Sequence, residues 1–266
     1  MFSLFRKALT ALFVVSLIAG CGRSDDVFRI GVMAGPEADL MRKAVEVAES
    51  RSNGEFKFEV IEFSDYISPN IALNDGSIDM NAFQHEPYLN QMINDRGLSL
   101  VKVGTTFVYP IGGYSNEVES LAQLKDGDVI SIPNDPTNEA RALMILHKAG
   151  IIELDDVNNL VATPSNIIVN PLNLRFVELE AAQLPRSLED VTVAFINSTY
   201  SVPSGLIPTR DALVVEGADS PYVNLMVTRM DNQSDPRVDL VVAGYQSDTV
   251  KELAEELFKG GAIASW

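Results

Sequence analysis

The chain is 266 residues long, is 46% hydrophobic and carries a formal net charge of −17. This length and hydrophobic content can fill a sizeable core and allow two lobes. So acidic a protein repels phosphate backbones, which argues against a nucleic-acid partner. The single cysteine excludes an internal disulfide, and two histidines far apart in sequence argue against a multi-histidine metal site. We therefore expect neither a metal nor a cofactor.

The first residues have the pattern of an export signal. Arg6 and Lys7 precede the uncharged apolar run 8–18, which leads into the small residues Ala19 and Gly20. A basic start, an apolar stretch of about 7–15 residues and a small-residue cleavage site describe a secretory signal. A membrane span would need about 20 apolar residues.

The segment Ile18-Ala19-Gly20-Cys21 resembles the lipobox of bacterial lipoproteins, in which the cysteine is acylated and becomes the first mature residue. We expect a signal peptide at 1–20 and a lipidated tether at 21–27; the alternative is an incidental cysteine beside an ordinary cleavage site. Loss of the two basic residues of the signal changes the net charge from −17 to −19, so acyl chains rather than charge must hold the protein on an anionic membrane. The prediction is an exported protein, lipid-anchored to the bacterial cell membrane or outer membrane and facing the periplasm or exterior.

The mature chain begins with alternating strands and helices. Strands are expected at 28–33, 56–63 and 78–83, and helices from Gly35-Pro36 to Asn53-Gly54, near 69–74 and from Glu86-Pro87 onward. Strands and helices that alternate in this way indicate parallel pairing through right-handed crossovers.

The same order restarts after residue 120. Strands are expected at 128–132, 174–178, 191–196 and 222–228, and helices at 136–148 and, broken or as two short helices, within 236–258. The stretch 155–173 is rich in turn residues and receives no predicted element.

Two α/β units predict a two-lobed α/β fold with two strand-like hinge crossings, near 108–114 and 221–227. Lobe I is expected to comprise 28–110 and 225–266, and lobe II 111–224. Because open α/β sheets bind ligands beyond the carboxyl ends of their strands, the site should face the gap between the lobes.

An aromatic cluster follows the third predicted strand. Phe83, His85 and Tyr88 lie within six residues, and Tyr66 belongs to the preceding strand-to-helix loop. Aromatic faces in a concave site could enclose an apolar or thioether side chain, although Phe83 and Tyr88 could equally be ordinary core residues. His85 and Glu86 could suggest a metal or acid–base pair, but adjacent side chains diverge and further ligands are missing.

An arginine occupies the start of the predicted helix at 136–148. Asp135 can cap this helix and Pro136 suits its first position, which places Arg141 within the first two turns, near the positive end of the helix dipole. The helix dipole does not stabilise a cation at this end, so an arginine here is better explained if it binds an anion. Its planar guanidinium suits a carboxylate. The alternatives are a solvated arginine or one paired with an acidic neighbour.

Two asparagines also follow or interrupt apolar strands. Asn197 comes directly after the strand at 191–196, and Asn224 interrupts an apolar run. A buried amide must find partners or cost about 1–3 kcal/mol, so each either braces the backbone or accepts a hydrogen bond from a ligand, for example from an ammonium group.

Common catalytic and nucleotide-binding motifs are missing from the sequence. It contains no Gly-x-Ser-x-Gly elbow, no phosphate-cradling loop and no dinucleotide Gly-x-Gly-x-x-Gly. We therefore expect a binding protein rather than an enzyme.

The chain resembles the methionine-binding lipoproteins of the MetQ/NlpA family, the substrate-binding components of methionine-importing ABC transporters. The resemblance includes the block Pro133-Asn134-Asp135-Pro136-Thr137-Asn138. Other matching blocks are 35–38, 81–88, 106–111, 178–181, 183–188, 220–225, 245–247 and 260–262. It implies a type II periplasmic binding protein fold that closes over an amino acid.

The resemblance also implies roles for the candidate residues. Arg141 would pair with the ligand carboxylate, and Asn197 and Asn224 would hold its polar end, with Asn224 near the amino group. The thioether would be surrounded by Tyr66, Phe83, His85 and Tyr88.

The expected function is capture of methionine by a monomer and its delivery to an ABC permease with its ATPase. The alternatives are a binding protein for another amino acid or a methionine-containing dipeptide, and a surface lipoprotein without a transport role.

Overall fold

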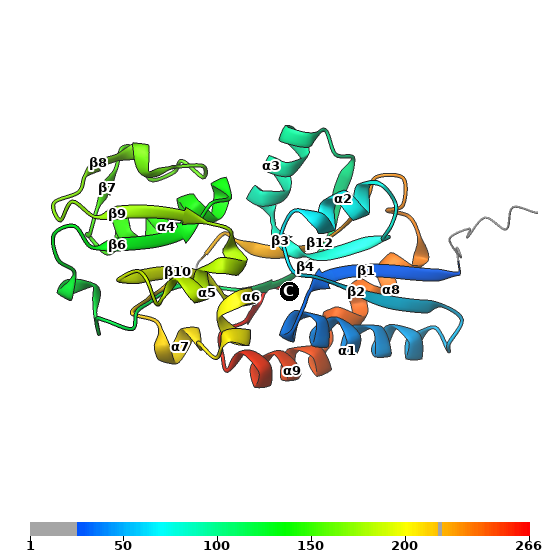
Figure 1. Cartoon of the computed structure of the whole chain (residues 1–266). Coiled ribbons are helices and arrows are strands. Elements are labelled where there is room, and N and C mark those ends of the chain that lie inside the picture. Colours follow the sequence, from blue (N-terminus) through cyan, green and yellow to red (C-terminus); the bar gives the residue numbers. More distant parts are fainter. Residues whose placement is uncertain (1–25, 218–219) are drawn as a thin grey trace, which may run out of the picture.

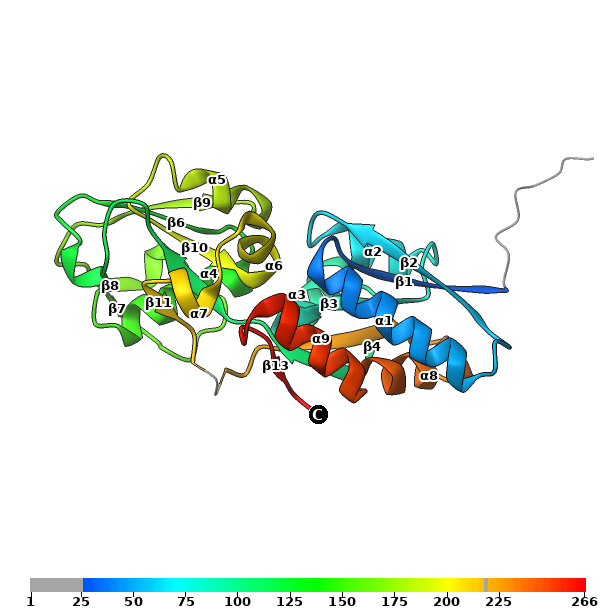
Figure 2. The ribbon, with the colours of Figure 1, turned by 90° about the horizontal axis from the view of Figure 1, so that it is seen from below.

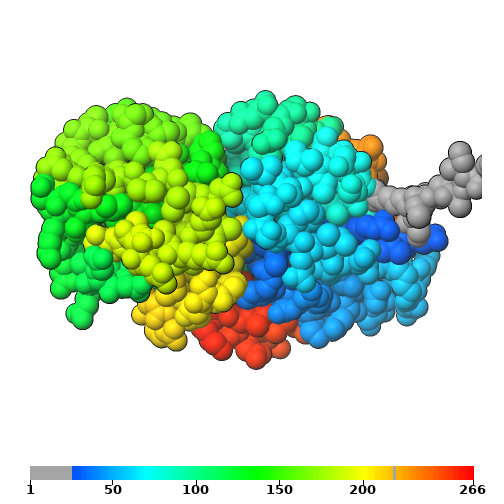
Figure 3. Space-filling model, viewed as in Figure 1, coloured from blue at the N-terminus to red at the C-terminus, as the bar shows by residue number. Residues whose placement is uncertain are grey.

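The structure is a computed structural model that describes residues 26–217 and 220–266. Two α/β lobes lie side by side and are joined by extended chain segments (Figures 1 and 2). In the space-filling view the lobes are two rounded bodies in contact with each other (Figure 3). The architecture is the mixed α/β, two-lobed fold that the sequence predicts.

Lobe I is built on a six-stranded sheet in the described part of the chain, with the order β13-β4-β12-β3-β1-β2. Its strands are β1 (Val27–Met33), β2 (Lys57–Phe63), β3 (Met80–His85), β4 (Leu100–Val108), β12 (Val223–Arg229) and β13 (Ile263–Ala264). Strand β1 pairs in parallel with β2 and β3, whereas β12 runs antiparallel to β3 and β4.

Helices cover both faces of this sheet (Figures 1 and 2). They are α1 (Pro36–Arg51), α2 (Ser68–Asn74), α3 (Glu86–Arg96), α8 (Pro236–Tyr245) and α9 (Asp248–Phe258). Alternate residues of β1, including Phe28 and Ile30, face the core shared with α1, α8 and α9. A Cβ on Gly244 would lie 2.4 Å from the Ala44 carbonyl oxygen, so the close approach of α8 to α1 requires glycine there.

Lobe II contains a second sheet with the order β11-β5-β10-β6-β9. Its strands are β5 (Ile111–Tyr114), β6 (Val129–Pro133), β9 (Arg175–Leu179), β10 (Val193–Asn197) and β11 (Val214–Val215), beside a separate pair β7 (Glu153–Leu154) and β8 (Ile167–Val169). Its helices are α4 (Pro136–Lys148), α5 (Leu184–Ser187), α6 (Ser198–Ser201) and α7 (Pro208–Asp211). Strand β6 is parallel to β9 and β10, and β5 is antiparallel to β10.

Most predicted elements are present, with shifted ends. The third strand, predicted at 78–83, begins and ends two residues later, at Met80 and His85. His85 is therefore both the last residue of β3 and the N-cap of α3. The segment 236–258 forms two helices, and β8 lies in the stretch 155–173 that received no predicted element.

Two chain segments cross between the sheets. The first crossing is Tyr109-Pro110, between β4 and β5, and the second leaves β11 at residues 216–217 and enters β12 through residues 220–222. Strand β12 begins at Val223, so Asn224 lies in the sheet of lobe I, one residue before the point at which the sequence divided the lobes. The expected signal peptide and most of the tether, with Cys21, lie outside the described residues. Among the residues that are described, no helix combines the length and apolar character needed to cross a bilayer.

Candidate functional site

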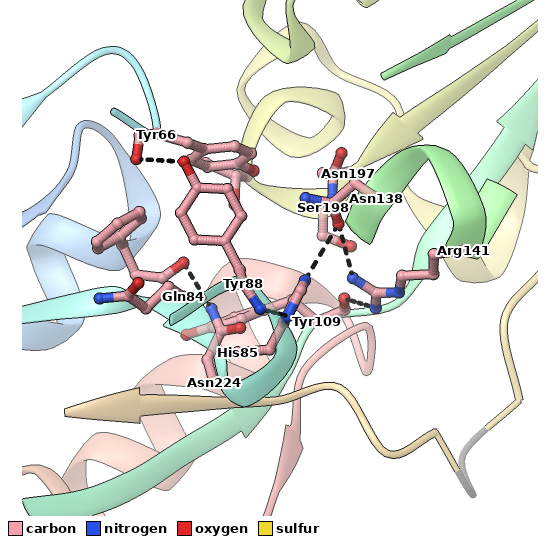
Figure 4. A pocket seen from close by; sticks show the side chains of 12 residues that line it. Tyr66, Gln84, His85, Tyr88, Tyr109, Asn138, Arg141, Asn197, Ser198 and Asn224 are labelled. Carbon is pink, nitrogen blue, oxygen red and sulfur yellow. Dashed lines mark hydrogen bonds between the residues drawn. The ribbon is translucent and has the colours of Figure 1, made fainter. Parts of the chain in front are cut away.

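All seven residues predicted to bind a ligand line one narrow pocket between the lobes (Figure 4). Tyr66, Phe83, His85, Tyr88 and Asn224 come from lobe I, and Arg141 and Asn197 from lobe II. The lining is completed by Gln84, Tyr109, Asn138, Ser198 and Thr199, which the sequence reasoning did not select. The pocket lies at the carboxyl ends of β3 and β10 and at the start of α4, the place where open α/β sheets hold ligands.

Three aromatic rings form the apolar wall. The ring centroids of Tyr66, Phe83 and Tyr88 lie 6.1–6.3 Å from one another, and the Tyr88 hydroxyl donates a hydrogen bond to the Tyr66 carbonyl oxygen at 2.8 Å. Phe83 and Tyr88 also belong to the core of lobe I. These two residues are therefore core side chains that also line the pocket.

His85 connects the aromatic wall to the polar wall. Its Nδ1 accepts a hydrogen bond from the backbone N–H of Tyr88 at 3.2 Å, which leaves the proton on Nε2, 3.3 Å from Oδ1 of Asn138 in lobe II. Burial, reinforced by the nearby charge of Arg141, lowers the pKa of His85 to about 3. The ring is therefore a neutral donor across the interlobe gap. Within the described ranges, no group of three or more His, Cys, Asp or Glu residues is placed to hold a metal ion.

Asn138 is the polar centre of the pocket. Its Nδ2 donates to both carboxylate oxygens of Asp135 at 3.0 Å, and Asp135 also caps α4 by accepting from the Asn138 backbone N–H. Its Oδ1 is therefore directed towards His85, Asn197 and Arg141. A sequence signal existed, because Asn138 precedes Arg141 by three residues and so shares its helix face.

Arg141 is 3% exposed and its charge is already paired. Its Nε donates to Oε1 of Glu216 at 2.7 Å, and its Nη2 donates to Oε2 of Glu216 and to the Tyr109 carbonyl oxygen, the latter at 2.8 Å. The acidic neighbour considered from the sequence is thus present, and its carboxylate binds Nε and Nη2 of the planar guanidinium. Nη1 lies 3.4 Å from Asn138 Oδ1 and is the nitrogen left for a ligand (Figure 4).

The two asparagines present acceptors to the same pocket. Asn224 donates its Nδ2 to the Phe83 carbonyl oxygen at 3.1 Å, and Asn197 donates its Nδ2 to Asn138 at 2.9 Å. Each bond orients the amide so that Oδ1 remains available. In the part of the chain that the structure describes, Oδ1 of Asn197 is buried and has no hydrogen-bond partner, which makes it an acceptor in want of a donor.

Side-chain contacts next to the pocket join the two lobes. Thr199 donates from Oγ1 to Oε1 of Glu37 at 2.6 Å, joining α6 of lobe II to the first turn of α1 in lobe I. Tyr200 adds a hydrogen bond from its hydroxyl to the Ser64 carbonyl oxygen at 3.1 Å, and its ring centroid lies 5.2 Å from that of Tyr66. These contacts exist only when the lobes are together, and no local sequence pattern predicts them.

The chain is similar in sequence and in structure to bacterial lipoproteins and substrate-binding proteins. A family model described as NlpA lipoprotein matches residues 28–266. The chain is 48% identical to the D-methionine-binding lipoprotein MetQ of Salmonella typhi over 264 residues, which cover 97% of each chain. Among solved structures, an ABC transporter periplasmic substrate-binding protein from Coxiella burnetii is similar at a TM-score of 0.86 and 48% identity, covering 90% of this chain and 100% of that one. A nutrient-binding protein from Burkholderia cenocepacia bound to methionine is similar at a TM-score of 0.87 and 41% identity, with the same coverage.

Proposed function

Because the chain belongs to the NlpA lipoprotein family, we propose that it is a lipid-anchored binding protein that captures methionine between its lobes and delivers it to an ABC permease with its ATPase. The ligand is suggested by relatives named as D-methionine-binding lipoproteins and by the similar structure described as bound to methionine. The transport partner is suggested by the relative described as an ABC transporter substrate-binding protein. The protein acts as a monomer and holds its ligand without converting it.

The observation that carries the proposal is the division of one pocket into three chemical zones. Nη1 of Arg141 supplies a donor for the ligand carboxylate, and Oδ1 of Asn197 and of Asn224 supply acceptors for its ammonium group. The wall of aromatic rings defined above suits a thioether, since each sulfur–aromatic contact contributes about 0.3–1.5 kcal/mol. The presence of all three zones in one pocket fits a zwitterion with an apolar side chain.

Native mass spectrometry and calorimetry on soluble Cys21→Ser protein test this function. We expect retained or added methionine in the mass spectrum, and titrations with L-methionine, D-methionine and a methionine-containing dipeptide should rank the ligands. A bound mass equal to that of another amino acid would favour a binding protein for that amino acid. No thermal shift with any of these ligands would favour a surface lipoprotein without transport function.

Arg141→Ala tests the carboxylate contact. Loss of one charge-assisted hydrogen bond should weaken methionine binding about tenfold or more. Because this change leaves buried Glu216 unpaired, circular dichroism and thermal unfolding must first show that the variant is folded. Arg210→Ala is the matched control, since Arg210 is exposed and pairs with Asp211 on the same lobe. Unchanged affinity in Arg141→Ala would contradict the assignment.

A further inference from the structure

The guanidinium of Arg141 is bound by both interlobe crossings. Tyr109, in the first crossing, supplies its carbonyl oxygen, and Glu216, in the second, supplies its carboxylate. Glu216 is itself fixed, because its backbone N–H donates to the Ile111 carbonyl oxygen at 3.0 Å and its side chain is 9% exposed. Arg141 therefore belongs to α4 by sequence but is positioned by the hinge.

Counting the donors of Arg141 shows what remains for a ligand. A guanidinium has five N–H groups. The single N–H of Nε and the two of Nη2 are directed to Glu216 and Tyr109, which leaves the two on Nη1, one of them near Asn138. The ring of Tyr222 covers one face of the group, with Cζ of Arg141 4.7 Å from the ring centroid.

Glu216 lies behind Arg141 relative to the ligand. It does not line the pocket that holds the aromatic and asparagine side chains. It lines a separate cavity on the other side of Arg141, together with Met144, Lys148 and Tyr222. Glu216 therefore orients the guanidinium without occupying the place of a ligand carboxylate.

We propose that Glu216 is the positioning residue for carboxylate recognition: its bidentate hold on Nε and Nη2 of Arg141 presents Nη1 to the ligand. The inference rests on the proposed function, since it concerns how the same site recognises an α-carboxylate. It predicts that the effect of Glu216 is confined to ligands that carry this group.

The experiment compares methionine with methioninol, in which a hydroxymethyl group replaces the carboxylate. In Glu216→Gln the amide nitrogen faces an N–H of the guanidinium, so the two-bond hold is broken while side-chain size is kept. By calorimetry on soluble protein we expect methionine to bind about tenfold more weakly, the cost of one charge-assisted hydrogen bond, and methioninol to bind as it does to the parent. Glu189→Gln, the same change at an exposed position of lobe II, should alter neither titration.

Each other result has a definite meaning. Equal weakening of both ligands would show a structural role and overturn the inference, as would unchanged or tighter methionine binding. If Glu216→Gln does not fold, Glu216→Asp decides, because a shorter carboxylate keeps the charge but loosens the hold and should weaken methionine alone. If the parent protein binds no methionine, the proposed function is overturned as well. If the parent and Glu216→Gln bind methionine with equal affinity, only the role of Glu216 is overturned.

Discussion

Two buried asparagines, Asn81 and Asn197, use their amide groups in opposite ways. Asn81 donates to Asn70 and to the Pro69 carbonyl oxygen and accepts from Gln84, so its amide is satisfied at both ends. Asn197 donates to Asn138 and leaves its carbonyl oxygen without a partner in the described chain. The first amide braces α2 against β3. The second has a free acceptor that costs stability until a ligand binds.

Alanine substitution at these two positions should therefore give different results. Asn81→Ala should lower the free energy of unfolding of the ligand-free protein by about 1–3 kcal/mol, because it leaves buried partners unsatisfied. Asn197→Ala should lower it by less, since it removes an acceptor that was already unsatisfied, yet it should weaken methionine binding about tenfold. Urea unfolding and calorimetry check the pair; full affinity in Asn197→Ala would remove this residue from the site.

The sequence predicts the side chains of the pocket better than their partners. All seven residues selected from it line the pocket, because six of them lie near a strand end or a helix start and Asn224 interrupts an apolar run, and a local pattern can reveal both features. The partner of Arg141 could not be predicted, because Glu216 is 75 residues away and approaches only through the return of the chain at the second crossing. The sequence left the two interpretations of Arg141 open, and the structure shows a residue that is both paired and pocket-lining.

At the scale of the elements, the start of α1 meets α6 across the gap. Glu37 lies in the first turn of α1, is 4% exposed and accepts the hydrogen bond from Thr199 of the other lobe. Burial raises the pKa of Glu37 to about 7, an effect that the Thr199 bond partly offsets. A carboxyl group that is solvated when the lobes separate and buried when they meet takes up a proton on closure.

Methionine affinity should therefore depend on pH through Glu37. The raised pKa favours the protonated, closed state, so its contribution is complete below the ordinary glutamate range and is lost as the pH rises through about 7. We expect several-fold weaker binding at about pH 8 than at about pH 5.5, and Glu37→Gln should remove most of this difference because an amide oxygen accepts from Thr199 at every pH.

Glu139→Gln is the matched control for this titration. Burial also raises the pKa of Glu139 to about 7, helped by the charges of Glu178 and Asp135, but all three residues belong to lobe II. The control should keep the pH dependence of affinity that the parent shows. Calorimetry at several pH values decides, and a dependence that persists in Glu37→Gln would rule out the proposed coupling.

The elements that escaped prediction have weak or broken patterns. Strand β4 pairs with β12 through two register shifts, so its apolar residues do not alternate regularly, and Gly104 interrupts it. Strands β11 and β13 have two residues each, too few to show a period. Both short strands form where a neighbouring edge is available, which depends on the tertiary structure.

For the whole molecule, anchoring and binding occupy separate parts of the chain. The pocket-lining residues lie between Tyr66 and Asn224, whereas Cys21 precedes β1. With a net charge of −19 after loss of the signal, the protein gains nothing from adsorption to an anionic surface, so lipid on Cys21 would supply the attachment and a high local concentration near a permease.

Cys21→Ser should thus separate delivery from capture. We expect unchanged methionine affinity by calorimetry, because no pocket residue is altered, and loss of radiolabelled palmitate from the protein, because the thiol that would carry the lipid is gone. Radiolabelled methionine uptake at low external concentration should fall in the same strain. Serine-substituted protein that still incorporates radiolabelled palmitate would refute lipid attachment at this residue.

Tyr109 and Glu216, which together form a clamp on Arg141, also limit how lobes can be exchanged between homologues. Arg141 is part of α4 and would be exchanged together with lobe II. Its two partners lie in the crossings, Tyr109 in the first and Glu216 in the second. A chimera cut within the crossings would place the arginine of one parent in the clamp of the other. Junctions placed before Tyr109 and after Tyr222 transfer lobe II with its own clamp, so the smallest exchangeable unit is a lobe together with both of its crossings.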